Sequence, residues 1–134
     1  MARLETIEGI GPHYAARLRE AGVRSTDALL AAGGTARGRQ ELAQKTGIGD
    51  EYILDWVNRS DLMRVRGIGE EYSDLLEWAG VDTTVELGQR NAQQLHSKLL
   101  EVNAAKRLVR RPPSLKMVAD WIVQARSLPR AISY

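Results

Sequence analysis

A short segment of the sequence occurs twice, and this duplication limits the possible folds more than any other feature. Residues 7–23 are IEGIGPHYAARLREAGV, and residues 65–81 are VRGIGEEYSDLLEWAGV, an offset of 58 positions. Both copies place Gly-Ile-Gly before a segment of helical periodicity and end on Ala-Gly-Val. Repetition of this kind indicates two copies of one structural unit.

A second pair of matching segments follows at a longer offset. ILDWV at 53–57 returns as VADWI at 118–122, 65 positions on, so the second copy has about seven extra residues. The sequence therefore predicts two repeats, about 3–62 and 63–128, and a flexible tail over 129–134 that has nothing after it to pack against.

The apolar residues recur at helical spacing, and strand patterns are absent. We therefore expect an all-α fold in which the duplicated units pack as one compact domain over 1–128, with a pseudo-two-fold repeat. Asp50, Ser60, Thr83, Asn91 and Ser114 are the expected N-caps, and Gly22 and Gly80 are the expected left-handed helix ends. The expected helices are 3–7, 12–21, 26–32, 36–45, 50–58, 61–65, 70–79, 84–89, 92–107 and 115–127.

The composition excludes several classes of protein. The sequence has no Cys, which rules out disulfides, thiolate metal sites and thiol nucleophiles. It has no apolar run near the roughly 20 residues that span a bilayer, so we expect a cytoplasmic protein without a membrane partner. The net charge is +2, and the positive excess gathers in KRLVRRPPSLK, residues 106–116.

Three Gly-Ile-Gly turns are present, at 9–11, 47–49 and 67–69. We expect both glycines of each turn to have positive φ, and the Ile between them to point into the core as a plug. The backbone N–H groups at the start of the following helix then face solvent and, together with the helix dipole, suit a phosphate.

These residues resemble a known motif. GIGPHYAARL is similar to the helix-hairpin-helix motif, whose members bind the DNA backbone through the minor groove without sequence preference. TGIGDEYILDWVNRSDLMRVRGIGEEYSDLLEWAGVDT and VRRPPSLK, together with the repeat, also resemble an uncharacterised bacterial family of small helix-hairpin-helix domains. The resemblance extends to about residue 128 and implies the fold. It implies no activity.

The three turns differ in their charge. In the first, Pro12 suits the first helical position, and His13 and Arg17 can face a phosphate. In the third turn, Glu70 and Glu71 replace Pro12 and His13. The second turn is followed by Asp50 and Glu51. Carboxylates at the start of the helix repel an anion. The candidate backbone-binding residues are therefore Gly9, Ile10, Gly11, His13 and Arg17, with Gly47, Gly49, Gly67 and Gly69 as weaker candidates.

Where a fourth turn is expected from the offset of 65, the sequence has Arg111-Pro112-Pro113-Ser114. The surrounding cations can contact phosphates as point charges and forks. The alternative is a solvated basic helix end, which suits the negative end of the helix dipole. The candidates here are Lys106, Arg107, Arg110, Arg111 and Lys116.

The three tryptophans are expected to differ in role. Trp56 and Trp121 occupy equivalent places in ILDWV and VADWI, so we expect them to anchor the core rather than to stack on bases. Trp78 has no equivalent, and we expect it to be partly buried beside its hairpin; an exposed Trp78 would instead indicate a contact surface.

The sequence contains no pattern of catalytic residues. His13 and His96 have no companions at ligand spacing, so we expect neither a metal site nor a cofactor. The resulting hypothesis is a non-enzymatic module that binds the DNA backbone, duplex rather than single-stranded. The alternative is a protein-interaction or scaffold module in which the same hairpins hold a helical platform and acidic helix starts face a basic partner.

Overall fold

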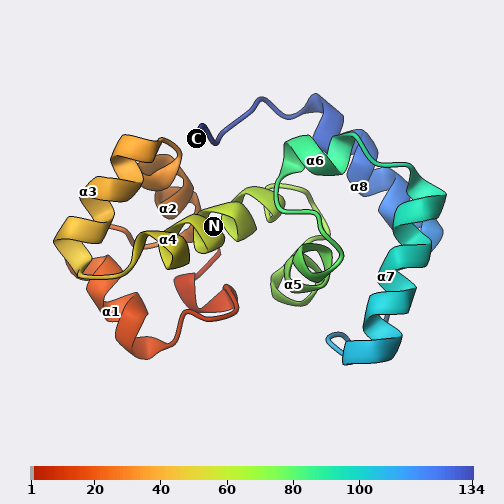
Figure 1. Cartoon of the computed structure of the whole chain (residues 1–134), viewed down its shortest axis with the longest axis horizontal. Coiled ribbons are helices and arrows are strands. Elements are labelled where there is room, and N and C mark those ends of the chain that lie inside the picture. Colours follow the sequence, from red (N-terminus) through yellow and green to blue (C-terminus); the bar gives the residue numbers. More distant parts are fainter. Residues whose placement is uncertain (1) are drawn as a thin grey trace. The chain divides into compact units, whose positions relative to one another are not determined.

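A computed structural model describes residues 2–134 and confirms the all-α prediction. No strand occurs in this part of the chain, and no helix in it is long and apolar enough to cross a membrane. The elements are a short 3-10 helix η1 (Leu4–Thr6) and the α-helices α1 (Pro12–Glu20), α2 (Thr26–Gly33), α3 (Ala36–Thr46), α4 (Asp50–Leu62), α5 (Glu70–Trp78), α6 (Thr84–Gly88), α7 (Ala92–Lys106) and α8 (Leu115–Ser127) (Figure 1).

Short polar side chains start most of these helices. Five residues accept a hydrogen bond from the backbone N–H three residues later: Ser25, Thr35, Thr83, Asn91 and Ser114. The prediction was right for three of these caps and missed the other two. Gly22 and Gly80 have φ values of 89° and 91° just after α1 and α5, so the predicted left-handed helix ends are confirmed.

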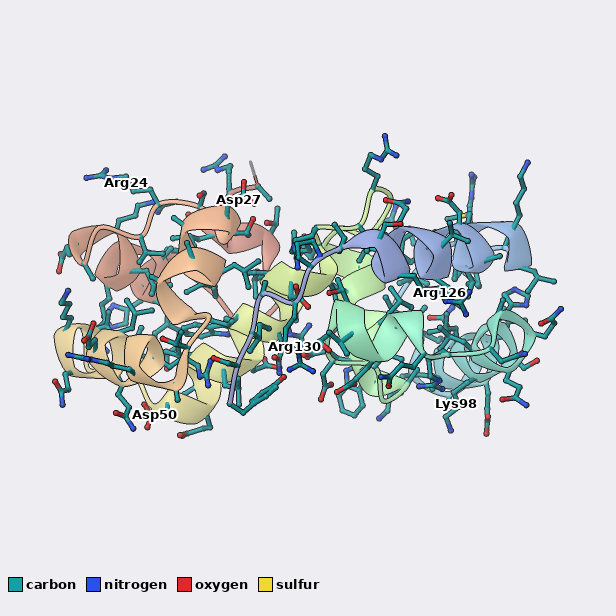
Figure 2. All side chains as sticks on the ribbon, turned by 90° about the horizontal axis from the view of Figure 1, so that it is seen from above. Arg24, Asp27, Asp50, Lys98, Arg126 and Arg130 are labelled. Atoms are coloured by element: carbon teal, nitrogen blue, oxygen red, sulfur yellow. The ribbon has the colours of Figure 1, made fainter. Side chains whose placement is uncertain are left out.

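The sequence prediction of two helices over 50–58 and 61–65 was wrong, because α4 is continuous from Asp50 to Leu62. The Ser60 side chain does not cap a new helix. Its hydroxyl is buried and donates a hydrogen bond of 2.9 Å to the carbonyl of Trp56, one turn earlier. Asp50, the other N-cap expected here, is the first residue of α4 and points outward from it (Figure 2).

The described chain divides into two compact units: residues 2–61 with Arg130–Tyr134, and Leu62–Pro129. We call these unit 1 and unit 2. Unit 1 has a buried aliphatic core around Trp56, built from η1 and α1 to α4. Unit 2 has one core cluster that begins at Leu62 and includes Trp121 and Ala125. In unit 2, Arg126 extends from α8 to the end of α6, where Nε donates to the carbonyl of Gly88 at 2.9 Å (Figure 2).

The C-terminal residues are not a free tail, which corrects the expectation for 129–134. Ile132 is buried, and the Ser133 N–H donates to the carbonyl of Gly34 at 2.7 Å. The buried Arg39 guanidinium donates to the carbonyls of Gly33 and Ser133 at 2.9 and 2.8 Å. Residues 130–134 therefore belong to the packed structure of unit 1, because Ile132 is buried and two backbone groups of Ser133 bond to Gly34 and Arg39.

Candidate nucleic-acid interface

The glycines within each Gly-Ile-Gly turn have different conformations. The first glycine has positive φ in all three turns: 97° at Gly9, 72° at Gly47 and 100° at Gly67. The second does not. Gly11 (φ −85°, ψ −178°) and Gly69 (φ −114°, ψ −152°) have extended backbone. The prediction of two positive φ angles per turn was therefore wrong, because one left-handed residue is enough to reverse the chain before the helix.

The isoleucine between the glycines is a plug in each turn, as predicted. Ile10, Ile48 and Ile68 are all buried. A buried tryptophan packs against the first glycine of two turns. A Cβ on Gly9 would lie 3.3 Å from Nε1 of Trp56, and a Cβ on Gly67 would lie 3.0 Å from Nε1 of Trp121. Both tryptophans are buried, as the core-anchor interpretation requires.

The helices after the first and third turns begin without a side-chain cap. Their N-caps are Gly11 for α1 and Gly69 for α5, and neither has a side-chain oxygen that could accept the first N–H groups. In α1 the following residues are Pro12 and an exposed His13, and no acid occurs in the first helical turn. In α5 they are acidic, so only α1 offers an uncapped end without a repelling carboxylate.

The second turn is the least suited to an anion. Gly47 is exposed, but the carboxylate of Glu51 folds back over Gly49, so that a Cβ on this glycine would lie 2.8 Å from Oε1. A phosphate at this turn would have to displace a side chain of its own sign.

An aromatic cluster borders the first turn in unit 1. The ring centroids of His13 and Tyr14 are 6.1 Å apart, and those of Tyr14 and Trp56 are 5.2 Å apart. Tyr52 stacks on Trp56 at 6.2 Å and is half exposed. These contacts fix the start of α1, while Arg17, one turn further on, remains half buried.

An ion pair holds η1 against α1 behind the first turn. Arg19 Nη2 donates to Glu5 Oε1 at 2.7 Å, and this hydrogen bond lowers the pKa of the Glu5 carboxyl below its ordinary value. A lowered carboxyl pKa adds stability above the pKa of the unfolded chain, and this stability is lost as pH falls through the folded-state pKa. We therefore expect Arg19→Gln to lower the melting temperature at neutral pH, and we expect the difference to shrink as pH falls below the ordinary glutamate pKa and through the lowered pKa of Glu5.

The measurement is a series of thermal melts from pH 7 to pH 3 on the wild type and Arg19→Gln. Arg37→Gln is the control, because the Arg37–Glu41 pair spans 3.3 Å between far more exposed side chains and contributes little. A melting-temperature difference for Arg19→Gln that is the same at both ends of the series would contradict this account of Glu5.

In unit 2 the five predicted cations lie within one short segment, residues 106–116, which we call the basic segment. All five are exposed. Across residues 2–134, no carboxylate lies within ion-pair distance of any of them. The sequence contains no Asp or Glu between Glu101 and Asp120, which accounts for this.

The basic segment is held in one conformation by side chains that the sequence prediction did not include. Asn103 is buried; its Nδ2 donates to the carbonyl of Val109 at 3.1 Å, and its Oδ1 accepts from the Val109 N–H at 2.9 Å. Val109 is itself buried. Arg107 ends α7 in the left-handed region, with φ of 52°, and its N–H donates to the carbonyl of Asn103.

Two further side chains bind the far end of the same segment. The hydroxyl of Tyr72, in α5, donates to the carbonyl of Arg111 at 2.8 Å. His96 Nε2 lies 3.0 Å from the carbonyl of Pro113, a buried residue. The cations therefore stand on a fixed backbone, unlike those of a frayed helix end.

A hollow of about 730 Å³ lies beside this segment in unit 2. Arg107 and Arg110 line it, and so does Glu71 from the start of α5. The two arginines therefore share one concave surface with the carboxylate of Glu71. This carboxylate is one of the two that make the third turn unsuitable for an anion.

Trp78 differs from its expected state. It is 53% exposed rather than partly buried, and Lys106 Nζ lies 4.0 Å from its ring centroid. An exposed Trp78 indicates a contact surface, and its contact with Lys106 joins it to the basic segment, which no sequence pattern predicts.

The predicted residues form two separate groups. Unit 1 contains the first turn with His13 and Arg17, and unit 2 contains the basic segment together with the third turn. The residues that the prediction missed are Asn103, Tyr72 and His96. Of these, Asn103 could have been noticed, because a buried-face Asn in the last turn of a helix is suited to bind the chain that follows.

The sequence model described as "Domain of unknown function (DUF4332)" matches residues 8–128. No curated protein matches the chain, and no solved structure does.

Proposed function

We propose that this chain, which belongs to the DUF4332 family, binds the DNA backbone without sequence preference and has no enzymatic role. In this proposal the Gly-Ile-Gly turns are helix-hairpin-helix motifs, and duplex DNA is the partner. The contacts are phosphate contacts from two surfaces, the basic segment of unit 2 and the first turn of unit 1.

The basic segment is the observation on which the proposal depends. Five exposed cations without a carboxylate partner stand on a backbone that Asn103, Tyr72 and His96 hold in place. Unpaired cations on a fixed surface bind phosphates with a small loss of conformational entropy and release condensed counterions from the DNA. A basic helix end that only complements its own dipole needs no such support.

The first Gly-Ile-Gly turn adds a second phosphate contact. The N–H groups at the start of α1 have no side-chain cap, and the first turn of this helix contains no acid. His13 and Arg17 lie in the first two turns of the same helix. Donors of this kind suit a phosphate oxygen, and the contact with the backbone fixes position rather than sequence.

The alternative, a protein-interaction module, is favoured by the acidic helix starts. Glu70 and Glu71 in α5 and Asp50 and Glu51 in α4 are exposed and suit a basic partner. DNA at low salt separates the two functions, because an acidic contact surface gains nothing from a polyanion.

The test of DNA binding is a fluorescence-anisotropy titration of a labelled duplex at several salt concentrations. We expect the wild type to bind, with an affinity that falls steeply as salt rises. In the double variant Arg110→Ala/Arg111→Ala, two phosphate contacts are lost, so the logarithmic salt slope should flatten by about two units and affinity at 0.1 M salt should fall roughly 10- to 100-fold.

The control variant removes two cations that are already paired with carboxylates, Arg37→Ala/Lys98→Ala. It changes the net charge by the same amount and should leave the slope nearly unchanged. Equal losses in the two double variants would show a response to net charge alone. Absence of binding to any duplex at low salt would remove the DNA function and leave the protein-interaction module.

A further inference from the structure

The contact between Trp78 and Lys106 suggests a finer assignment for unit 2. The chain has three tryptophans. Two of them, Trp56 and Trp121, are 2% exposed, whereas Trp78 is 53% exposed at the end of α5. A large aromatic ring in water is unfavourable without a partner, and it lies beside the segment richest in cations in this chain.

From this juxtaposition we infer that Trp78 is a stacking platform for one unpaired DNA base, whose neighbouring phosphates run along the basic segment. The inference rests on the proposed DNA binding and adds a substrate class to the duplex: a strand with an unpaired base, as in a single-stranded segment or an overhang on a duplex. Flat aromatic rings flanked by cations are the general solution for binding single strands, because every base has a π face and every nucleotide has a phosphate.

In the free protein, the ammonium group of Lys106 lies over the ring of Trp78. A cation–π contact at an exposed site is weak, so Lys106 can leave the indole for a phosphate at little cost when a base takes its place. Trp78 then changes its partner from a cation to a base, while Lys106 changes from a ring to an anion. Each new contact is as favourable as the one it replaces or more so.

The geometry of α5 aligns this platform with the two arginines of the hollow. Trp78 and Glu71 are seven residues apart in α5, which places them on the same helix face and roughly 10 Å apart along the axis. Glu71 lines the hollow with Arg107 and Arg110, and α5 contacts α7, at whose end Lys106 and the basic segment begin (Figure 1). A strand with a base on Trp78 can therefore place its next phosphates at these arginines.

The experiment uses three ligands that differ in their bases and share their phosphates: a twelve-residue oligothymidylate, an abasic oligomer of the same length, and a blunt duplex. Fluorescence of the three tryptophans is followed during each titration, and anisotropy gives the affinities. Because Trp56 and Trp121 are buried, quenching reports Trp78. We expect the oligothymidylate to quench the emission and the abasic oligomer and the duplex to leave it nearly unchanged.

The variants separate stacking from charge. Trp78→Leu should bind the oligothymidylate roughly tenfold more weakly, with no change for the abasic oligomer or the duplex. Trp78→Phe, which keeps an aromatic face, should recover most of this loss. Circular dichroism and thermal melts on both variants show whether unit 2 is intact.

Three results would overturn the inference. Equal weakening of all three ligands by Trp78→Leu would show that Trp78 only positions Lys106. Unchanged oligothymidylate affinity in Trp78→Leu would remove the platform and leave phosphate binding in place. Failure of the wild type to bind any of the three at low salt would reject the DNA function together with the platform, and Trp78 would then be a protein contact.

Discussion

Gly67→Ser is expected to destabilise unit 2 by roughly 3 kcal/mol or more, whereas Gly69→Ser, two residues on, is expected to be neutral or slightly stabilising. The two changes add the same side chain to the same Gly-Ile-Gly turn. They differ only in what the backbone and the neighbours allow at each position.

Gly67 has two reasons to resist a side chain. Its φ of 100° lies beyond the left-handed region that other residues occasionally adopt. A Cβ there would also lie 3.0 Å from Nε1 of Trp121, a buried anchor of unit 2. Since the indole is close-packed, the added group must either displace it or strain the turn further.

Gly69 has neither reason. Its backbone is extended (φ −114°, ψ −152°), and nothing lies within 4 Å of a Cβ built there. As the N-cap of α5 it would gain from a serine hydroxyl, which can accept one of the N–H groups that start the helix. Chemical denaturation of both variants measures the difference in the free energy of unfolding. Similar losses for the two would show that Gly67 and Gly69 do not differ in backbone conformation and surroundings as described.

Gly67 and Gly69 show which features of the turn could be predicted from the sequence alone and which could not. The repeated Gly-Ile-Gly pattern predicted a turn, a buried Ile and a following helix, and all three are present at Ile10 and Ile68. The pattern could not say which glycine has the positive φ. The contacts of Trp56 and Trp121 with Gly9 and Gly67 were also hidden from it, because these tryptophans are distant in sequence from the turns.

The errors in the helices and in the tail have different physical origins. Ser60 was expected to start a helix because serine is a good N-cap, yet its hydroxyl bonds back to the carbonyl of Trp56 inside α4. Residues 129–134 were expected to fray because nothing follows them. Ile132 and the Arg39 contacts fix them through residues nearly a hundred positions away, which local patterns do not reveal.

The sequence predicts the charges of the candidate site, but it does not predict the side-chain contacts that hold the backbone of the basic segment. The excess of Lys and Arg in residues 106–116 is visible in the sequence. That these cations stand on a fixed backbone depends on Asn103, Tyr72 and His96, three polar residues from two helices with no shared pattern. The exposure of Trp78 beside Lys106 likewise became clear only from the packing of α5 on α7.

The second large effect is expected at Asn103, which connects the stability of unit 2 to DNA binding. Asn103→Ala leaves the N–H and the carbonyl of the buried Val109 without their partners. Unpaired buried groups of this kind cost about 1–3 kcal/mol each, so the free energy of unfolding of unit 2 should fall by roughly 2–4 kcal/mol. Ser97→Ala, at an exposed position of the same helix, should change it by less than about 0.5 kcal/mol.

The same variant tests whether the basic segment acts as a fixed surface. Asn103→Ala keeps every cation, so a site that needs only local positive charge should bind duplex DNA as tightly as the wild type does. If the phosphates require Arg107, Arg110 and Arg111 in their observed places, affinity should fall several-fold at a temperature where the variant is still folded, because the loosened segment loses conformational entropy on binding. The salt slope should change little, since the number of cations is the same. Lower stability with unchanged DNA affinity would show that the Asn103 contacts serve the fold alone, and the proposed interface would then depend on charge without position.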